Sequence, residues 1–549
     1  MGDRQQDVAN RYDLIVIGGG INGAGVARDA ALRGLKTALI EKGDVASGTT
    51  GWSTRLIHGG LRYLEYLEFG LVRESLRERE ILLKIAPHLV VPLQLTIPLY
   101  RNGSRSRSLI QAGMILYDLL SFDRSLPGHR MLGAAQFRQV FRSIHVDEAV
   151  GAAQYYDAQV PRAERLCWET VLAARMAGAD IFSYAEAISM PLEQGAIAEI
   201  ICRDAIDDSA FSLPVGPQTV VVNAGGPWVD SVCGLAKSLQ TPQLMGGTKG
   251  SHIIVDAFPG APPALYVEAK TDNRPFFIIP WLDRYLIGTT DLRYDGSLDA
   301  VKASDAEIDY LLAETNRIIP TAQLTRTDVK FTYSGIRPLP AKPSGSTSSI
   351  TRSHSIYDHT RDGASNLLSL VGGKLTTHRG SSAQLVAAVC HKLNRSTPPC
   401  LTASTPLPGS MLPTDAIVRD VQRQYGDRLP AATISHLFSI YGRQTERVLA
   451  LTDTSPDLLE PVVTTQPDIR AQVVFAEREE MARTMLDITL RRTSMAISEH
   501  YGRDVLPGIA AVLQTHCGWS QDRCDRDIAK HERYVRSNCV PDYVIETAM

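Results

Sequence analysis

A glycine-rich segment near the start of the chain could bind a pyrophosphate. Residues 12–17 are strand-forming and lead into Gly-Gly-Gly-Ile-Asn-Gly at residues 18–23. The first glycine of such a pattern permits a tight turn, the second brings backbone close to phosphates, and the third lets the following helix approach its strand. The positive end of that helix then faces the negative phosphates. The segment therefore predicts a dinucleotide site.

A carboxylate follows at the spacing that suits a ribose diol. The strand predicted over residues 36–40 ends at Glu41, about 20 residues after the glycines. An acid at this place favours a free 2′-hydroxyl over a 2′-phosphate. A glycine pattern alone would also fit an ordinary turn, but strand, helix, second strand and acid occur here in the expected order. We therefore expect a βαβ unit with a bound dinucleotide.

A second group of residues that could do chemistry comes directly afterwards. Residues 47–55 read Ser-Gly-Thr-Thr-Gly-Trp-Ser-Thr-Arg, and residues 58–63 read His-Gly-Gly-Leu-Arg-Tyr. Small hydroxyl residues and glycines supply donors and close backbone approach around a flat ring system with polar edges. On a helix, His58 and Arg62 would share a face. An isolated histidine is more often structural, but the adjoining nucleotide motif favours a functional one.

Length, charge and cysteine usage restrict the class of protein. The 549 residues suggest about two to four domains. Lys and Arg number 57 against 60 Asp and Glu, so no basic excess indicates a nucleic-acid partner. The eight cysteines lack CxxC or zinc-site spacing, which predicts reduced thiols and no metal site. The polar first ten residues and the absence of an apolar run of about 20 predict a cytoplasmic protein without a membrane span.

The order of apolar patterns indicates how the domains are arranged. Strand-like runs recur at residues 182–183, 219–223, 252–255, 276–280, 285–288 and 367–371. They predict a nucleotide domain interleaved with a second sheet over residues 1–400. Pro, Ser and Thr then gather, which predicts a linker at residues 401–412. Apolar residues at helical spacing in residues 414–425, 431–452, 470–493 and 508–536 predict a helical domain over residues 413–549.

The third of these helical stretches has a strongly amphipathic pattern. Its apolar residues form a stripe, beside which lie charged residues that include Arg491 and Arg492. The simplest interpretation is a helix with a buried stripe and a solvated charged face. We therefore expect both arginines to be exposed.

Three later segments complete a recognisable pattern. Residues 222–229 read Val-Asn-Ala-Gly-Gly-Pro-Trp-Val, residues 249–252 read Lys-Gly-Ser-His, and residues 372–379 read Gly-Gly-Lys-Leu-Thr-Thr-His-Arg. With the earlier motifs, and in the same order, they make the chain resemble the FAD-dependent glycerol-3-phosphate dehydrogenases, within the D-amino-acid-oxidase-like flavoproteins. The likeness extends to residues 477–493. Two departures are Trp52, where relatives usually have small residues, and Arg55, where lysine is also seen.

The resemblance implies a mixed α/β fold with a cofactor. The expected architecture is a Rossmann-like FAD-binding domain interleaved with an antiparallel-sheet substrate domain, followed by an all-helical C-terminal domain. A helix over residues 374–389 would direct its amides at the flavin pyrimidine edge. The residues expected to bind FAD are Gly18, Gly20, Ile21, Asn22, Gly23, Glu41, Lys42, Thr50, Ser53, Arg55, Ala187, Ala224, Gly225, Gly373, Lys374, Leu375 and Thr376.

The resemblance also implies a substrate, sn-glycerol 3-phosphate, and roles for the remaining polar residues. Arg337 and Arg352 would bind the phosphate, since guanidinium pairs bidentately with its oxygens. His58 would remove the C2 hydroxyl proton while hydride passes to the flavin. Arg62 and Lys374 would stabilise the alkoxide or the reduced flavin, and Tyr63 would orient the substrate.

The electron acceptor divides the remaining alternatives. Arg101, Arg105 and Arg107 precede apolar residues at 109–122, an amphipathic pattern suited to a membrane surface, although a buried helix flanked by charges fits as well. We expect a peripheral enzyme on the inner face of the cell membrane that reduces membrane quinone, and a homodimer by resemblance. The alternatives are a soluble oxidase that makes hydrogen peroxide, an amine or amino-acid oxidase on the same fold, and an FAD-binding sensor without turnover.

Overall fold

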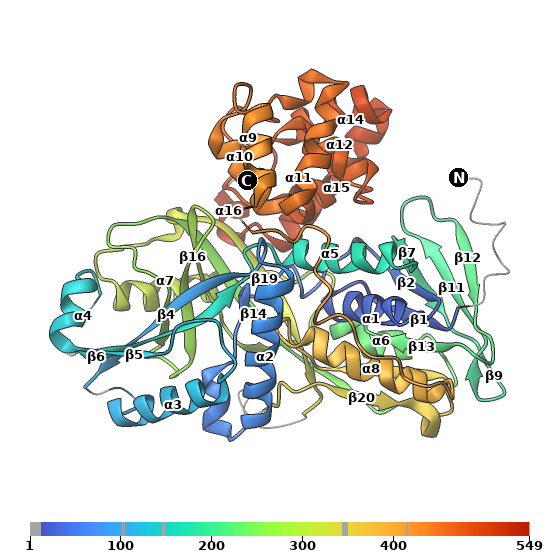
Figure 1. Ribbon diagram of the computed structural model, residues 1–549, viewed down its shortest axis with the longest axis horizontal. Coiled ribbons are helices and arrows are strands. Elements are labelled where there is room, and N and C mark those ends of the chain that lie inside the picture. The colour runs from blue at the N-terminus through green and yellow to red at the C-terminus, as the bar shows by residue number, and fades with distance from the viewer. Residues whose placement is uncertain are drawn as a thin grey trace.

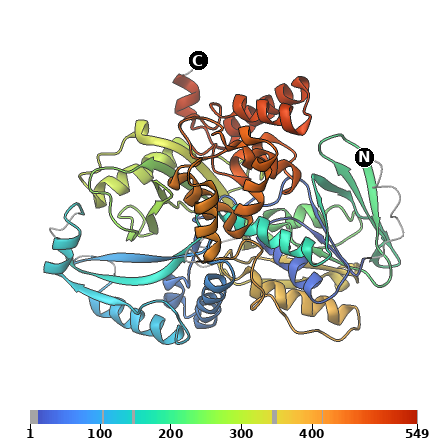
Figure 2. The same ribbon diagram turned by 45° about the horizontal axis from the view of Figure 1, so that its top comes forward.

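The structure is a computed structural model that describes residues 12–101, 103, 105–144, 149–342, 350–412 and 415–547. The start of the predicted helical stretch at residue 414 and the polar N-terminal ten residues lie outside this part. Two sheets lie side by side, and the C-terminal helices sit above the junction between them (Figures 1 and 2). This arrangement confirms the expected mixed α/β fold with a helical C-terminal domain.

The first sheet belongs to the nucleotide fold. Its order is β20-β21-β13-β1-β2-β7, and all neighbours pair in parallel except the edge strand β20. The βαβ unit expected at the glycine motif is present as β1, helix α1 (Ile21–Leu32) and β2, which ends at Glu41 as predicted. The strands are β1 (Leu14–Ile17), β2 (Thr37–Glu41), β7 (Asp180–Ser183), β13 (Val220–Asn223), β20 (Ser355–Asp358) and β21 (Leu367–Val371).

Both faces of this sheet are covered, as a parallel sheet requires. Leu14 and Val16 of β1 pack beneath α1, α5 (Ala163–Met176) and α8 (His378–Lys392). Ile15 and Ile17 point to the opposite face. That face is covered by a small antiparallel sheet of β8 (Ala185–Ser189), β11 (Glu199–Asp204) and β12 (Ala210–Pro214), beside α6 (Val229–Cys233) and the hairpin β9 (Leu192–Glu193) and β10 (Ala196–Ile197).

The second sheet is built from segments that alternate along the chain with those of the first. Its order is β18-β14-β17-β16-β15-β4-β6-β3, with β19 beside β14 and β5 beside β6, and its pairs are antiparallel except β4 with β15. The strands are β3 (Leu56–Ile57), β4 (Val91–Tyr100), β5 (Arg130–Gly133), β6 (Ala149–Gln159), β14 (Met245–Asp256), β15 (Leu265–Glu268), β16 (Pro275–Trp281), β17 (Arg284–Gly288), β18 (Leu292–Arg293) and β19 (Val329–Pro340).

Helices pack against both faces of this second sheet. Helices α4 (Ala134–Val140) and α7 (Asp305–Ile318) share one apolar cluster with it. Helices α2 (Phe69–Ile85) and α3 (Arg107–Leu120) share the other. The two sheets therefore have separate cores. They meet where the chain passes from one sheet to the other, and a ligand can lie between the domains there.

The C-terminal helices form a further core of their own. They are α9 (Ala416–Tyr425), α10 (Ala431–Tyr441), α11 (Thr445–Ala450), α12 (Arg470–Arg478), α13 (Met485–Asp487), α14 (Leu506–Cys517), α15 (Gln521–Asn538) and α16 (Asp542–Thr547). Residues 401–412 contain no helix or strand, and Leu407 in this segment is buried in the core under α1.

The third helical stretch departs from its prediction. Residues 470–493 form α12, an irregular turn, α13 and a π-helix (Ile488–Arg492) rather than one helix. Arg491 and Arg492 are buried, and both pair with Asp44 from the nucleotide fold. The expectation of a solvated charged face was wrong here because a carboxylate distant in the sequence neutralises both charges.

Candidate active site

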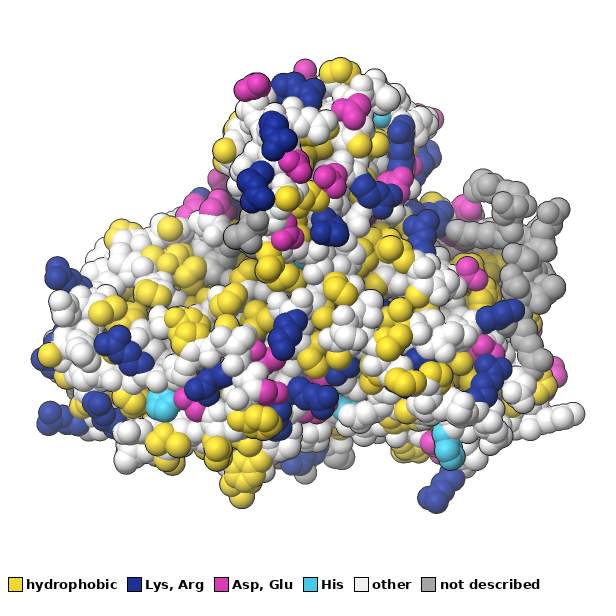
Figure 3. Space-filling view, viewed as in Figure 1, with side chains coloured by type: hydrophobic (Ala, Val, Ile, Leu, Met, Phe, Trp, Pro, Cys, Tyr) yellow, Lys and Arg dark blue, Asp and Glu magenta, His cyan; other side chains and the backbone are white. Residues whose placement is uncertain are grey.

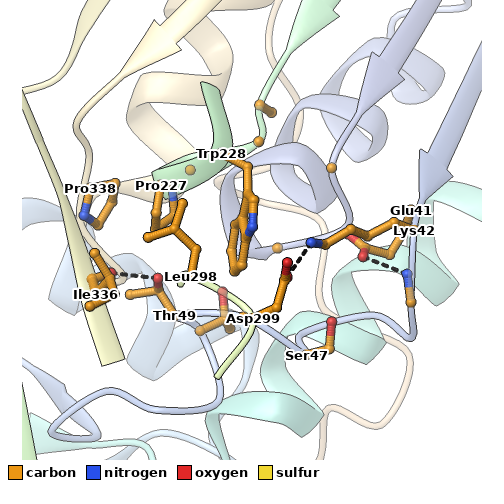
Figure 4. A pocket seen from close by; sticks show the side chains of 18 of the residues that line it. Glu41, Lys42, Ser47, Thr49, Pro227, Trp228, Leu298, Asp299, Ile336 and Pro338 are labelled. Atoms are coloured by element: carbon orange, nitrogen blue, oxygen red, sulfur yellow. Dashed lines mark hydrogen bonds and ion pairs between the residues drawn. The ribbon is translucent and has the colours of Figure 1, made fainter. Parts of the chain in front are cut away.

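A cavity of about 510 Å³ lies where the first sheet meets the second and the C-terminal helices. Much of its wall comes from the segments that directly follow β1, β2, β7, β13 and β21. These are the carboxyl ends of the parallel strands, where open α/β sheets bind their ligands. Figure 4 shows Trp228 standing between Glu41 and Lys42 on one side and Ile336 and Pro338 on the other.

The glycine motif forms a close-packed cradle at one end of the cavity. Gly18 has φ +111°, and a Cβ there would lie 2.7 Å from the carbonyl oxygen of Ala224. A Cβ on Gly23 would lie 1.9 Å from the carbonyl oxygen of Gly18. The side chain of Thr50 accepts a hydrogen bond from the Ile21 amide at 3.0 Å. Gly18 and Gly23 therefore occupy places where a side chain cannot fit, as the motif predicts.

Glu41 lines the cavity and is held by the backbone. Its Oε2 accepts a hydrogen bond from the Gly19 amide at 2.6 Å, and its Oε1 accepts one from the Gly43 amide at 2.9 Å. Burial raises the pKa of this carboxyl, while these two amides lower it. The carboxylate is thus fixed beside the glycine turn, in a position where a ribose could bind.

An ion pair that the sequence did not indicate crosses the cavity. Lys42 Nζ lies 2.5 Å from Asp299 Oδ1 and 4.4 Å from the centre of the Trp228 ring (Figure 4). Trp228 belongs to the motif at residues 222–229, so a local signal for it existed. Asp299 lies in an irregular segment before α7, and no local pattern marks it. The pairing joins the turn after β2 to the segment before α7 over the cavity.

Most of the residues predicted to bind the cofactor line this cavity, and three do not. Gly23 supports the cradle from beneath, and Thr376 Oγ1 accepts a hydrogen bond from the His58 amide at 3.2 Å. Arg55 is the third. The predicted residues on the wall are Gly18, Gly20, Ile21, Asn22, Glu41, Lys42, Thr50, Ser53, Ala187, Ala224, Gly225, Gly373, Lys374 and Leu375.

Arg55 has a different surrounding from the one expected. Its two terminal nitrogens lie 2.7 and 2.8 Å from the Glu164 carboxylate on α5 and also donate to the carbonyls of Pro161 and Gly51. The guanidinium carbon lies 5.0 Å from the centre of the Trp281 ring, and the side chain is buried. The Arg55 side chain therefore anchors the segment behind the cavity rather than reaching its wall, because Glu164 binds it.

The segment after β21 also differs from its prediction. Gly372 and Gly373 have φ +83° and +98°, and helix α8 begins at His378 rather than at Lys374. Left-handed glycines keep the chain out of a helix at this point. The residues at 373–375 consequently meet the cavity from an irregular turn, and the helix amides expected there lie further along the chain.

His58 lies near Lys374, which is on the cavity wall, but His58 itself does not line the cavity. Burial, and then the charges of Lys374 and Arg352, lower the pKa of His58 to about 3. Burial and the charge of Arg352 lower the pKa of Lys374 to about 7. Lys374 Nζ is buried, has no hydrogen-bond partner among the described residues, and lies 3.7 Å from the centre of the Tyr63 ring. The group combines a neutral imidazole with cations that have few counter-ions.

The two arginines predicted to bind phosphate are held differently. Arg337 on β19 donates to Asp291 Oδ1, Thr289 Oγ1 and the carbonyl of Thr290 at 2.9–3.0 Å. Burial lowers its pKa to about 10, although Asp291 opposes the shift. Arg352 precedes β20 and makes no hydrogen bond to a described residue, but its charge lowers the pKa of Arg337, Lys374 and His58. Of the two, Arg352 has the freer guanidinium.

Arg62 stands apart from this group. It lies on the short 3-10 helix Leu61–Tyr66, and its guanidinium donates to the Tyr66 hydroxyl at 3.4 Å. His58 precedes that helix, and Gly60 between them has φ +77°. The expectation that His58 and Arg62 share a helix face was wrong, because the left-handed glycine turns the chain.

Among the described residues, no group of three or more His, Cys, Asp or Glu could hold a metal ion.

Comparison with known proteins agrees with this geometry. Residues 13–381 match the family model described as FAD dependent oxidoreductase, and residues 400–524 match the C-terminal domain of alpha-glycerophosphate oxidase. The chain is 56% identical to a glycerol-3-phosphate dehydrogenase of Synechocystis over 97% of its length and 98% of that protein. It is 36% identical to the aerobic glycerol-3-phosphate dehydrogenase of Escherichia coli over 88% of its length and 94% of that protein.

A solved structure extends the agreement to three dimensions. The glycerol-3-phosphate dehydrogenase of Bacillus halodurans in complex with FAD superposes with a TM-score of 0.77 at 26% identity. The match covers 96% of this chain and 95% of that one. The L-alpha-glycerophosphate oxidase of Mycoplasma pneumoniae, at 15% identity and a TM-score of 0.53, shares the fold.

Gly23→Ala is expected to abolish tight FAD binding. The new Cβ would lie 1.9 Å from a backbone oxygen, so α1 and its phosphate-facing amides must shift. Overpacking of this kind costs about 1–3 kcal/mol, so flavin content should fall about tenfold or more. The ratio of flavin to protein absorbance measures it. Gly70→Ala, which meets nothing within 4 Å, is the matched control. Equal flavin content in both variants would contradict the cradle.

The cavity fits FAD on its own evidence. Gly18 and Gly23 leave no room for a side chain, so the backbone packs closely at the turn where this motif binds a pyrophosphate. Buried polar atoms without a protein partner, Asn22 Oδ1, Trp228 Nε1 and Lys374 Nζ, belong to residues on its wall. Such atoms require a partner, and a cofactor with polar edges can supply it. The chain therefore belongs to the FAD-dependent oxidoreductases, in the group of the glycerol-3-phosphate dehydrogenases.

Proposed function

We propose that the protein oxidises sn-glycerol 3-phosphate to dihydroxyacetone phosphate and passes the electrons to membrane quinone. The observation that carries the proposal is the group formed by Lys374, on the wall of the FAD cavity, with the neighbouring His58 and Arg352. A buried ammonium without a counter-ion is unfavourable unless an anion joins it. A phosphorylated alcohol would supply that anion, and the names of the similar proteins support this substrate.

In this proposal Arg352 is the main residue that binds the phosphate. Its guanidinium is free to form a bidentate pair with phosphate oxygens. Arg337 is already bound to Asp291 and the Thr289–Thr290 segment, so it contributes charge from a fixed position. Tyr63, whose ring faces Lys374, would limit how the substrate chain lies between them.

His58 is the proposed proton acceptor. Because its pKa is lowered to about 3, the imidazole is neutral at physiological pH, and one ring nitrogen can accept the C2 hydroxyl proton. FAD, when bound, supplies the hydride acceptor. Lys374 would stabilise the negative charge that develops on the C2 oxygen as its proton leaves. Thr376, bound to the His58 amide, holds the histidine segment against the residue 374 turn.

The decisive experiment is anaerobic mixing of the purified flavoprotein with sn-glycerol 3-phosphate. Loss of the visible flavin band would demonstrate both cofactor reduction and substrate. Persistence of the band with FAD bound would overturn the proposal. Sarcosine or a D-amino acid would then test an amine or amino-acid oxidase, and failure of every substrate would favour a sensor without turnover.

Arg352→Met is expected to raise the KM for glycerol 3-phosphate. A hydrogen bond to a charged group is worth about 1.5–3 kcal/mol, so kcat/KM should fall about 10- to 150-fold, mostly through KM. Steady-state kinetics with an artificial acceptor measure this change. Arg361→Met removes an equal charge from an exposed position nearby and should leave KM unchanged. A normal KM in the Arg352 variant would show that phosphate binds elsewhere.

Helix α3 supports the membrane part of the proposal. Its inner face, Ile110, Met114 and Tyr117, is buried against the second sheet. The outer face and the residues after it expose large apolar side chains, namely Leu109, Ile115, Leu119 and Phe122, of which Phe122 is 75% exposed. Hydrophobic side chains gather along the lower edge of the molecule in Figure 3, where Figure 1 places α3. Exposed patches of this kind are typical of interaction sites.

The charges around α3 only partly match the pattern read from the sequence. Arg105 is paired with Glu65 and Glu268, and Arg107 donates to the Val150 carbonyl. Arg101 is exposed. No helix in the described part of the chain is long and apolar enough to cross a membrane. The proposal is therefore surface docking through the apolar face of α3, with less help from basic residues than the sequence indicates.

Replacing Leu119 and Phe122 by aspartate is expected to release the protein from vesicles. Each large side chain contributes about 1.5–3 kcal/mol when buried, so binding to vesicles with anionic lipid should weaken at least about tenfold. Co-sedimentation measures the bound fraction. Val140→Asp, at the exposed last residue of α4, is the control and should bind normally. Unchanged binding of the double variant would exclude α3 as the docking surface.

A soluble oxidase remains the second candidate. It is favoured by the match of residues 400–524 to a domain described from alpha-glycerophosphate oxidase. The two candidates require the same substrate site and differ only in the electron acceptor. Oxygen uptake with formation of hydrogen peroxide, in the absence of quinone, would favour the oxidase. Reduction of an added quinone without oxygen uptake would favour the dehydrogenase.

A further inference from the structure

One wall of the FAD cavity is made by the C-terminal helices. Leu486 on α13, Arg491 on the π-helix, and Tyr534 and Asn538 on α15 line it. Arg491 pairs with Asp44, which lies in the segment after β2 and also lines the cavity. The cofactor site is thus assembled from both ends of the chain.

A buried ion cluster holds this wall in place. Asp44 Oδ2 accepts hydrogen bonds from Arg491 Nε at 2.7 Å and Arg492 Nη1 at 2.6 Å, and Asp44 Oδ1 accepts one from Arg492 Nη2 at 2.8 Å. Arg491 also pairs with Asp487. All four side chains are almost wholly buried. Removing one partner of a buried pair leaves an uncompensated charge, so Asp44 contributes strongly to holding these helices in place.

Two further contacts connect the wall to the opposite side of the cavity. Asn538 Oδ1 accepts a hydrogen bond from the Val301 amide at 3.2 Å. The same segment carries Asp299, whose carboxylate pairs with Lys42. Trp52, on the cavity wall, packs in one apolar cluster with Leu486 and Tyr534. The C-terminal helices therefore position the segment that crosses the cavity.

We propose that the C-terminal helices are part of the FAD site, so that FAD binding and the docking of these helices stabilise each other. A ligand that contacts both faces of an interface strengthens that interface, and by linkage the interface strengthens binding of the ligand. The Asp44–Arg491 pair and the Asn538–Val301 contact are the positioning elements. The site of FAD would then depend on residues that no nucleotide-binding motif contains.

The test follows release of flavin from diluted, full-length holoenzyme by the rise in flavin fluorescence. Arg491→Lys keeps the charge but loses the two-sided contact with Asp44 and Asp487, and release should be about tenfold faster. Asn538→Ala removes the hydrogen bonds of this side chain with the Val301 amide and the Tyr534 carbonyl. It should give about a threefold increase and serves if the first variant fails to fold. Arg447→Lys, in an exposed pair with Glu479 of the same helices, should match the wild type.

A second readout separates positioning from ordinary stability. The melting temperature of each variant is measured with and without added FAD. Coupling requires that FAD raise the melting temperature less in the Arg491 and Asn538 variants than in the wild type and the Arg447 control. If the melting temperatures fall but the rise caused by FAD and the release rate stay unchanged, these residues only stabilise the fold and the proposal is overturned.

Discussion

Replacing His58 by asparagine is expected to slow reduction of the flavin by glycerol 3-phosphate about 10²- to 10⁴-fold, the usual contribution of a positioned general base. Burial and the charges of Lys374 and Arg352 keep the imidazole neutral by lowering its pKa to about 3. Asparagine is similar in size and can form hydrogen bonds, but it cannot accept the C2 proton. Flavin should remain bound, since His58 does not line the FAD cavity.

Rapid anaerobic mixing, with flavin absorbance as the signal, measures this rate. His516→Asn, at a histidine paired with Asp457 among the C-terminal helices, is the control and should react at the wild-type rate. Because protonation of His58 begins only near its lowered pKa, its ionisation should not reduce the wild-type rate between about pH 8 and pH 5. A His58 variant as fast as the wild type would assign the base to another residue.

Replacing Lys374 by methionine is expected to lower kcat/KM about 10²- to 10³-fold, as when one donor to a developing oxyanion is removed. The pH profile gives a second signature. The pKa of Lys374 is lowered to about 7, chiefly by burial, so the ammonium is present below that pH and is lost above it. The kcat/KM of the wild type, which reports groups of the free enzyme, should therefore fall as pH rises through about 7.

The methionine variant should lack this limb of the pH profile. A bound phosphate dianion favours the charged ammonium, so kcat of the wild type should fall only at a higher pH than kcat/KM. Lys84→Met, at an exposed lysine near the end of α2, is the control and should retain both the rate and the pH profile. A variant of Lys374 with the wild-type pH profile would show that another group titrates.

Local motifs allowed the nucleotide fold to be predicted well. The strand, glycine turn, helix and second strand were identified because each depends on neighbours in the sequence: Gly18 on its own φ angle, and Gly23 on a carbonyl five residues earlier. Apolar periodicity likewise located the helical C-terminal domain, since a stripe at helical spacing must be buried. The family resemblance then indicated FAD, which the comparisons support.

Local patterns were less reliable where the outcome depended on a distant partner. Arg55 was expected at the cofactor, but Glu164 binds it behind the cavity. Arg491 and Arg492 were expected in solvent, but both side chains are buried and pair with Asp44. Asp487 lies four residues before Arg491 and pairs with it, but nothing near these arginines in the sequence identifies Glu164 or Asp44. The direction in which a charged side chain points is decided by the counter-ion that folding brings to it.

The sequence by itself determined the βαβ unit and the helical character of the C-terminal residues, because backbone preferences and apolar spacing are local properties. Of the second sheet it indicated only parts of β14, β16 and β17, and it missed the long strands β4, β6 and β19. Only the tertiary structure decided that His58 meets Lys374, that Arg337 is occupied by Asp291 while Arg352 is free, and that Lys42 pairs with Asp299 across the cavity. These contacts join residues far apart in the chain. Their energies depend on distance and burial in the folded molecule, which no local pattern records.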